Sequence, residues 1–126
     1  MATPFLDIYE TVDGKLTDTE KTRLTSNKRK ELLKVSYPKI KPYFRELTID
    51  YNNELIEEDL DETEILIFSL YIVLEYYRQE KIKYSKITNM VSDSTRITGF
   101  DSIRKVLDEN YTDIEKEIDN ILSTLL

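Results

Sequence analysis

Residues 61–77, DETEILIFSLYIVLEYY, decide the fold because they contain the most apolar stretch of the chain. Asp61 fits the N-cap position of a helix and Glu64 its third position, and acidic side chains suit the positive end of the helix dipole. The 13 residues after Glu64 are apolar almost all round. Such a pattern is typical of a helix that neighbours cover on most sides. We therefore expect one long buried helix that continues to about Val91.

The same apolar stretch is too short to cross a membrane. A membrane-spanning helix needs about 20 largely apolar residues. The first residues, Met1 to Asp7, contain neither a basic segment nor the apolar segment of a secretory signal. We expect a soluble, intracellular protein without a membrane partner.

The first 14 residues predict a helix of their own. Thr3 before Pro4 is typical of an N-cap followed by proline at the first helical position. Apolar residues recur at helical spacing from Phe5 to Val12, and Gly14 is a plausible end. The pattern predicts a short amphipathic helix.

Two further helices are expected before residue 45. Thr17 and Glu20 fit the capping box that starts a helix, which predicts a short helix here. Another helix should run through residues 32–35. Pro38 and Pro42 should end it, because the residue before a proline is pushed out of the helical region.

Residues 46–58 carry a weaker pattern. Residues 47–51 alternate like a strand, Asn52-Asn53 is a candidate turn, and residues 54–56 could return as a second strand. A short β-hairpin insertion near residues 46–58 is one interpretation. An irregular connector or a short helix is the alternative.

The last third of the chain predicts a second long helix. Residues 92–99 are typical of a polar loop, and the helix should start near Asp101 or Ser102. Apolar residues then recur in steps of three and four, which indicates a heptad-like seam for packing along another helix. The seam consists of Ile103, Leu107, Tyr111, Ile114, Ile118, Ile121 and Leu125. Residues 110–113 could interrupt it.

The fold class that these patterns predict is all-α. We expect a small, mainly helical bundle around a long central helix, with residues 1–126 in a single domain. Only two Gly and three Pro argue against a sandwich or barrel, which needs many tight turns. The 40% apolar content is adequate for a core.

The sequence lacks residues or motifs that several kinds of metal site and catalytic site require. Without His or Cys, the usual zinc sites and His-based or thiol catalysis are excluded. Asp50, Asn52 and Glu54 have the spacing of a calcium loop, but Leu55 stands where its glycine is needed. Ser-x-x-Lys occurs twice without its partner motifs, and no phosphate-binding glycine motif is present. We expect no enzyme activity, no cofactor and no metal site.

Charge is distributed unevenly along the chain. Residues 21–45 carry nine basic and one acidic side chain, whereas residues 46–66 carry nine acidic and no basic side chains. These blocks could face each other within the fold, each could face a partner, or both could be solvated helix faces. The net charge of −7 argues against general nucleic-acid binding. The candidate partner-binding residues are Lys28, Arg29 and Lys30 in the basic block and Glu57, Glu58 and Asp59 in the acidic block.

The apolar C-terminus is another candidate partner-binding segment. Ile121, Leu122, Leu125 and Leu126 would be a costly exposed surface, so a partner is expected to cover them. The alternative is that they form the last turn of a core helix. The inner seam, from Ile103 to Ile114, is expected to lie against the long central helix.

Short motifs follow one another in a recognisable order. The chain resembles the small, mostly helical neck proteins of tailed bacteriophages, the head–tail connector or adaptor class, over nearly its whole length. The likeness consists of short structural motifs: FLDIYE at 5–10, LTD at 16–18, LL at 32–33, YPKIKP at 37–42, LDETEI at 60–65, LEYYRQ at 74–79 and TGF at 98–100.

The resemblance implies a structural virion assembly protein. Such a subunit would form a homo-oligomeric ring, commonly of twelve copies, beneath the portal and would continue the DNA channel. Its partners would be the portal protein and other neck or tail proteins, with passing DNA contacted only non-specifically. It would reside in the neck of the virion, and in the host cytoplasm during assembly. The alternative is a small helical regulatory or inhibitor module that binds another protein.

Overall fold

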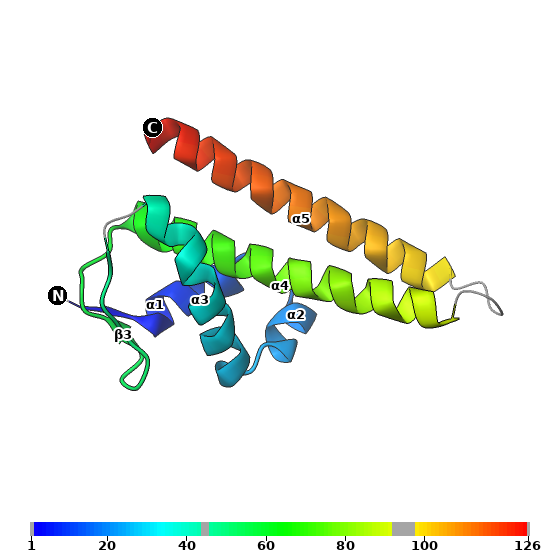
Figure 1. The fold of residues 1–126 in the computed structure, drawn as a ribbon, viewed down its shortest axis with the longest axis horizontal. Coiled ribbons are helices and arrows are strands. Elements are labelled where there is room, and N and C mark those ends of the chain that lie inside the picture. Colours follow the sequence, from blue (N-terminus) through cyan, green and yellow to red (C-terminus); the bar gives the residue numbers. More distant parts are fainter. Residues whose placement is uncertain (1, 44–45, 92–97, 126) are drawn as a thin grey trace. The chain divides into compact units, whose positions relative to one another are not determined.

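The long helix predicted from residue 61 is present as α4, Glu62–Val91, in the computed structural model, which describes residues 2–43, 46–91 and 98–125 (Figure 1). Its N-terminus is capped reciprocally. The Asp61 carboxylate accepts a hydrogen bond from the Glu64 N–H at 2.8 Å, and the Glu64 carboxylate accepts one from the Asp61 N–H at 3.2 Å. These two bonds satisfy backbone donors that the first helical turn leaves unpaired. Both predicted ends of the helix are confirmed.

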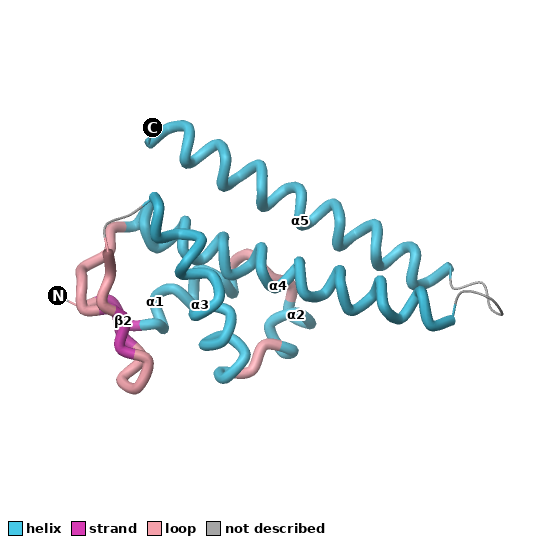
Figure 2. Tube along the Cα trace, viewed as in Figure 1, coloured by secondary structure: helices cyan, strands magenta, loops and turns pink. Residues whose placement is uncertain are grey.

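The chain divides within α4 into two compact units, Met1–Val73 and Leu74–Leu126, here called the N-terminal and C-terminal units. Helix dominates the described residues, and the strands are short (Figure 2). The predicted fold class, an all-α helical bundle with a short β-hairpin, is therefore confirmed. That residues 1–126 form a single domain stays a prediction.

Among the described residues of the N-terminal unit, three helices precede α4, and side-chain caps mark where the second and the third begin. They are α1 (Phe5–Asp13), α2 (Asp18–Arg23) and α3 (Ser26–Ile40). The capping box at α2 is formed as predicted, with hydrogen bonds of 2.9 and 3.3 Å between Thr17 and Glu20. The Thr25 hydroxyl accepts from the Lys28 N–H at 3.2 Å and caps α3.

The prediction that Thr3 caps α1 is wrong. Pro4 occupies the N-cap, and Thr3 lies in a two-residue strand, β1 (Thr3–Pro4). The buried Thr3 hydroxyl donates to the Glu58 carbonyl at 3.0 Å and accepts from the Leu60 N–H at 2.9 Å. A buried backbone group without a hydrogen-bond partner costs more stability than an exposed one at a helix end. The Thr3 hydroxyl therefore stabilises the segment leading into α4 more than it would stabilise α1 as a cap.

Pro38 does not end α3, contrary to the prediction. It lies inside the last turn, where its missing N–H removes one backbone hydrogen bond. The helix nevertheless reaches Ile40, which is fully buried on the same face as Leu33 and Ser36. A single 3₁₀ turn, η1 (Lys41–Tyr43), contains Pro42 and follows directly.

The predicted β-hairpin is present but shorter than its sequence pattern. Strands β2 (Ile49–Asp50) and β3 (Leu55–Ile56) pair antiparallel, and β1 pairs with the other edge of β3, so that the strand order is β1-β3-β2. The Asp50 carboxylate accepts hydrogen bonds from the N–H groups of Asn52 and Asn53, both at 3.1 Å, and closes the turn. The local pattern did not indicate the third strand.

Contacts on both α1 and α3 fix the first half of α4. The Ser69 hydroxyl, fully buried, donates to the Ile8 carbonyl at 3.2 Å, and the Ser36 hydroxyl donates to the Tyr71 carbonyl at 3.3 Å. Phe68 stacks on the ring of Tyr37, with centroids 6.4 Å apart. Apolar side chains from α1, α3, α4 and β3 fill this core. They are Phe5, Ile8, Val12, Leu32, Leu33, Ile40, Ile56, Ile67, Phe68, Leu70, Ile72 and Val73.

The C-terminal unit is a helical hairpin. Helix α5 (Thr98–Leu125) runs back along the second half of α4 (Figure 1). It begins earlier than predicted, since Thr98 and Gly99 are already helical, and it is not interrupted at residues 110–113. The rest of the predicted loop, residues 92–97, lies outside the described residues.

The seam of this helical hairpin differs from the prediction at its start and near its end, where Leu122 is buried and the predicted seam residue Ile121 is only half-buried. Leu107, Ile114, Ile118 and Leu122 are buried, whereas Ile103 is 40% exposed. A salt bridge of 3.0 Å between Lys81 and Asp108 joins the two helices, and the Lys81 ammonium lies 4.4 Å from the centre of the Tyr111 ring.

Candidate functional site

The three basic residues predicted to bind a partner lie in the first turns of α3, and each has an acidic neighbour. Lys28 lies 4.0 Å from a carboxylate oxygen of Glu31 on the same helix. Arg29 pairs with Asp13 of α1 at 2.6 Å, and Lys30 lies 3.9 Å from Glu54 of the β-hairpin. All three are half-buried. Because they point to different acids, they do not form one continuous basic surface.

Arg29 joins three helices of the N-terminal unit. Besides its ion pair with Asp13, its guanidinium donates to the carbonyls of Leu24 at 3.2 Å and Lys21 at 3.5 Å. It also lies 5.9 Å from the centre of the Tyr9 ring. These contacts make Arg29 an internal brace between α1, α2 and α3. Sequence reasoning missed this role because all of its contacts are set by the tertiary structure.

Tyr9, beside this brace, has an unusual hydroxyl. Among the described residues the hydroxyl is buried without a hydrogen-bond partner. Burial, followed by the negative charge of Glu54, raises the pKa of Tyr9 to about 12, although the nearby Arg29 lowers it. A buried hydroxyl without a partner costs stability.

We expect Tyr9→Phe to leave the free energy of unfolding at neutral pH unchanged or to raise it by up to about 1 kcal/mol, because an unpaired buried donor is removed. Between pH 10 and 12 the unfolded wild type releases the phenol proton while the native protein retains it, so its stability falls as pH rises. The variant lacks this contribution. Urea unfolding across this pH range checks both points.

Tyr43→Phe is the control for this experiment, since Tyr43 is 48% exposed. Ultraviolet titration of native wild type and of the two variants assigns the tyrosinate signal. Ionisation of Tyr9 near the ordinary value of 10 would contradict the burial of its hydroxyl.

The three acidic residues predicted to bind a partner follow β3. The carboxylate of Glu58 accepts a hydrogen bond from the Thr48 N–H at 2.5 Å, and the Glu57 N–H donates to the Thr48 carbonyl at 3.0 Å. The side chains of Glu57 and Asp59 are exposed. Glu58 therefore has a structural role in holding the base of the β-hairpin, whereas Glu57 and Asp59 lie at the surface.

Ion pairs join the basic and acidic blocks within the fold. Lys30 lies 3.9 Å from Glu54, and Lys41 lies 3.5 Å from Glu46. Both pairs are at least partly exposed, so their contribution to stability is at most about 1 kcal/mol each. Between these pairs, the ammonium of Lys34 lies 5.6 Å from the centre of the Tyr51 ring.

A recess of about 350 Å³ lies between α3 and the β-hairpin. Its lining side chains are Asn27, Lys30, Glu31, Lys34 and Tyr51. The two ammonium groups and the aromatic ring could receive a small anionic group, although Glu31 and the adjacent Glu54 offset part of the positive charge. Sequence analysis missed Tyr51 here because only hairpin pairing brings it to α3.

The predicted C-terminal binding segment is only partly accessible. Leu122 is 8% exposed and belongs to the buried seam, and Ile121 is half-buried. The side chains of Leu125 and Leu126 lie outside the described residues. Partner binding by Ile121, Leu122, Leu125 and Leu126 stays a prediction.

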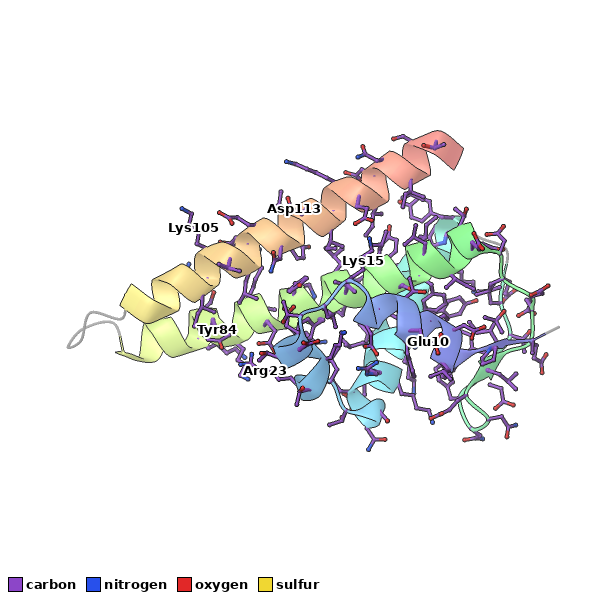
Figure 3. All side chains as sticks on the ribbon, turned by 180° about the vertical axis from the view of Figure 1, so that it is seen from behind. Glu10, Lys15, Arg23, Tyr84, Lys105 and Asp113 are labelled. Atoms are coloured by element: carbon purple, nitrogen blue, oxygen red, sulfur yellow. The ribbon has the colours of Figure 1, made fainter. Side chains whose placement is uncertain are left out.

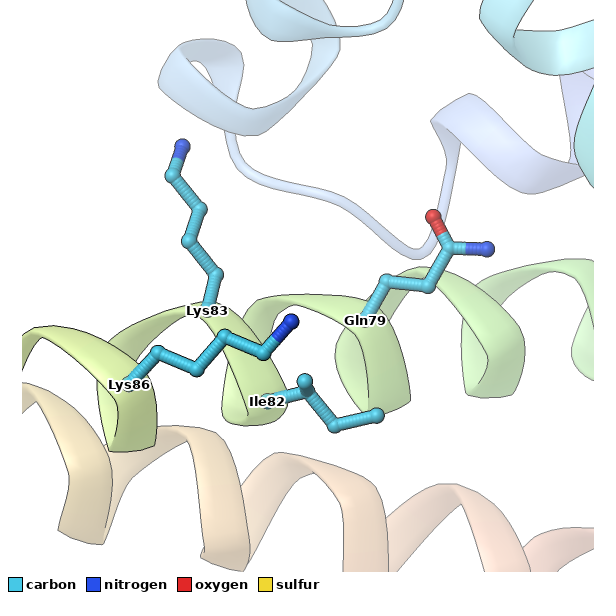
Figure 4. A pocket seen from close by; sticks show the side chains of 4 residues that line it. All are labelled: Gln79, Ile82, Lys83 and Lys86. Atoms are coloured by element: carbon cyan, nitrogen blue, oxygen red, sulfur yellow. The ribbon is translucent and has the colours of Figure 1, made fainter.

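The outer faces of the helical hairpin expose apolar side chains that sequence analysis did not single out. Ile82 of α4 is 42% exposed and Val106 of α5 is 53% exposed. Ile82 lies in a recess of about 490 Å³ together with Gln79, Lys83 and Lys86 (Figure 4). The sequence signal was that Ile82 lies between Lys81 and Lys83, and that Val106 lies between Lys105 and the seam residue Leu107.

The outer face of α5 is mainly acidic. Lys105 and Asp113 project from the side of α5 that faces away from α4 (Figure 3). A shallow hollow of about 400 Å³ on α5 is lined by Asp108, Glu109, Thr112, Asp113 and Lys116. The helical hairpin thus carries lysines beside an exposed isoleucine on one helix, and carboxylates near an exposed valine on the other.

Within the described residues, no group of three or more acidic side chains is placed to hold a metal ion. The Asp50 carboxylate, considered above for calcium, instead accepts hydrogen bonds from Asn52 and Asn53, including the Asn53 amide at 2.7 Å. These bonds, chiefly those from Asn53, lower the pKa of Asp50.

Comparisons of the chain with known proteins found no similar protein. No family model, no curated protein and no solved structure matches the chain. No described helix combines the length and apolar character that a membrane span requires.

Proposed function

We propose that this protein is a structural subunit of a tailed-phage neck, a head–tail connector or adaptor that forms a homo-oligomeric ring beneath the portal and continues the DNA channel. The observation that supports the proposal best is the helical hairpin of the C-terminal unit. Its inner seam is buried, yet Ile82, Ile103 and Val106 remain at least 40% exposed. Such exposed apolar side chains would become buried if the chain packed against copies of itself.

Energetics support a role in assembly. Fully burying a large aliphatic side chain contributes roughly 1.5–3 kcal/mol, so covering even two of these three residues would stabilise an assembly appreciably. The net charge of −7 agrees with a channel wall along which DNA passes without binding tightly. The resemblance to neck proteins points to the portal and to other neck or tail proteins as partners, in the virion and, during assembly, in the host cytoplasm.

Electron microscopy of the protein mixed with purified portal rings from candidate tailed phages tests the proposal. The expected result is an added ring of density on one face of the portal. The proposal is overturned if no tested portal gains density and the protein instead forms a small, defined complex with a non-portal protein. The latter result would favour the regulatory or inhibitor module.

The C-terminal tail provides a separate prediction. Deletion of residues 123–126 should leave helicity and the melting temperature almost unchanged, because the buried seam residue Leu122 is retained. Portal binding should weaken, because the deletion removes Leu125 and Leu126. Circular dichroism and pull-down with portal rings measure the two effects.

Leu122→Ala is the control for the deletion. It should lower the melting temperature because Leu122 is buried, in contrast to the deletion. If the truncated protein unfolds, the tail belongs to the core. If it binds the portal normally, the tail is not the portal contact.

A further inference from the structure

We propose that two copies of this chain associate head to tail through opposite outer faces of their helical hairpins. The α4 recess, defined by Gln79, Ile82, Lys83 and Lys86, receives the α5 ridge of a second copy, defined by Val106, Glu109 and Asp113. This contact would join neighbouring subunits of the ring, and in that respect the inference rests on the proposed function.

The α4 recess presents one exposed apolar side chain between positive charges. Its four residues follow the i, i+3, i+4 and i+7 pattern and therefore share one face of the helix. Lys83 projects away from the helix, and Lys86 extends along it (Figure 4). Neither ammonium is paired with an acid among the residues that the structure describes. The recess thus fits a partner that offers an aliphatic side chain and carboxylates.

The α5 ridge has this complementary chemistry. Val106, Glu109 and Asp113 lie at i, i+3 and i+7, so a valine that is 53% exposed shares a face with two carboxylates. Glu109 and Asp113 also line the hollow on α5, where Lys116 provides an opposing charge, and Lys105, four residues before Glu109, projects from the same side (Figure 3). Both glutamate and aspartate are exposed, and so is Val106.

The two surfaces cannot meet within one copy. The helices contact each other through Lys81 and Tyr111, whose ammonium and ring centre are 4.4 Å apart. Lys83 lies two residues beyond Lys81, and Asp113 lies two residues beyond Tyr111. At about 100° per residue, each therefore points to the side of its helix opposite the contact. Lys83 and Asp113 therefore face away from each other within one copy, and a second copy can bring a recess and a ridge together.

Pairing of two different surfaces has a geometric consequence. Each copy joined at its recess still presents a free ridge, so the contact repeats from subunit to subunit. Such a heterologous contact closes into a ring where the rotation allows and otherwise continues as a filament. In this contact Ile82 and Val106 would cover each other. The charge pairs would select the partner and its orientation more than they would increase the affinity.

Charge reversal on each surface tests the proposal by sedimentation velocity of the full chain over a range of concentrations. One variant carries Lys83→Glu and Lys86→Glu, and the other carries Glu109→Lys and Asp113→Lys. We expect wild type to self-associate and each variant alone to associate at least tenfold more weakly. An equimolar mixture of the two should regain association, because every recess then meets a ridge of opposite charge. High salt should weaken wild-type association, since exposed charges are screened over roughly 10 Å at 0.1 M.

A variant with Lys15→Glu and Lys39→Glu is the matched control for the recess variant, because it changes the net charge by the same amount and sign through exposed residues outside the C-terminal unit. It should associate like wild type. The proposal is overturned if wild type stays monomeric, if the charge-reversed variants associate normally while folded by circular dichroism, or if the mixture is not rescued. Because no portal is present, these outcomes are independent of the portal-binding test.

Discussion

Phe68→Ala is expected to lower the free energy of unfolding by about 3–5 kcal/mol. Phe68 is fully buried in the N-terminal unit and stacks on Tyr37 at a centroid distance of 6.4 Å. The hydroxyl of Tyr37 in turn accepts from the Leu47 N–H at 3.0 Å and donates to the Leu47 carbonyl at 3.2 Å. The variant therefore leaves a cavity and removes the surface that positions Tyr37. Urea unfolding followed by circular dichroism measures the loss.

Leu6→Ala is the control for this prediction. Leu6 is 62% exposed on α1, so its removal should change the free energy of unfolding by no more than about 0.5 kcal/mol. A loss below about 1 kcal/mol for Phe68→Ala would show that the site collapses around the missing ring or that the ring is not buried.

Arg78→Met is expected to lower the free energy of unfolding by about 1–3 kcal/mol. Glu75 is 1% exposed, and its carboxylate accepts hydrogen bonds from the Arg78 guanidinium at 2.5 and 2.8 Å and from the Gln79 amide at 3.1 Å. These hydrogen bonds, followed by the charge of Glu75, raise the pKa of Arg78. Without the arginine, a buried carboxylate loses its counter-charge. Because Arg78 itself is 44% exposed, water can replace part of the interaction, so the loss should be smaller than for a fully buried pair.

A double-mutant cycle provides the control. In a Glu75→Gln background there is no buried charge to compensate, so Arg78→Met should cost much less there than in wild type. Equal losses in the two backgrounds would show that Arg78 stabilises the protein through packing alone. Thermal or urea unfolding of all four proteins gives the coupling free energy.

Where the sequence analysis succeeded, the determining contacts lie within a single helical turn. The capping boxes at Thr17 and Asp61 each join residues three apart, and both are formed. The apolar run after Glu64 marks the first half of α4, whose residues the structure buries. The alternation at residues 47–51 and the turn at Asn52-Asn53 indicated a β-hairpin as one interpretation, and that interpretation is confirmed.

Where the sequence-based predictions are wrong, a distant part of the chain decides the conformation. Thr3 has the local pattern of a helix cap, but its hydroxyl bonds to Glu58 and Leu60, 55 and 57 residues away. Pro38 has the local pattern of a helix end, but burial of Ile40 extends α3 beyond it. Ile103 fits the periodicity of the seam, yet it is 40% exposed in the folded chain.

The candidate binding surfaces also depend on contacts between residues that are distant in the sequence. Sequence analysis identified Lys28, Arg29 and Lys30 as one basic segment, whereas the tertiary structure directs them to three different acids. It did not identify Ile82 or Val106, because whether a residue beside a seam is covered depends on the neighbouring helix.

By itself, therefore, the sequence determined that the protein is helical and where α2 and α4 begin, and it offered a hairpin as one interpretation of residues 46–58. Capping, periodicity and turn formation all act over at most a few residues, and those residues are adjacent in the chain. Only the tertiary structure decided which charges are paired, which apolar side chains stay exposed and which hydroxyl groups are buried. Each of these depends on a partner that chain folding brings from far away in the sequence, as Glu54 is brought to Lys30 and Ile8 to Ser69.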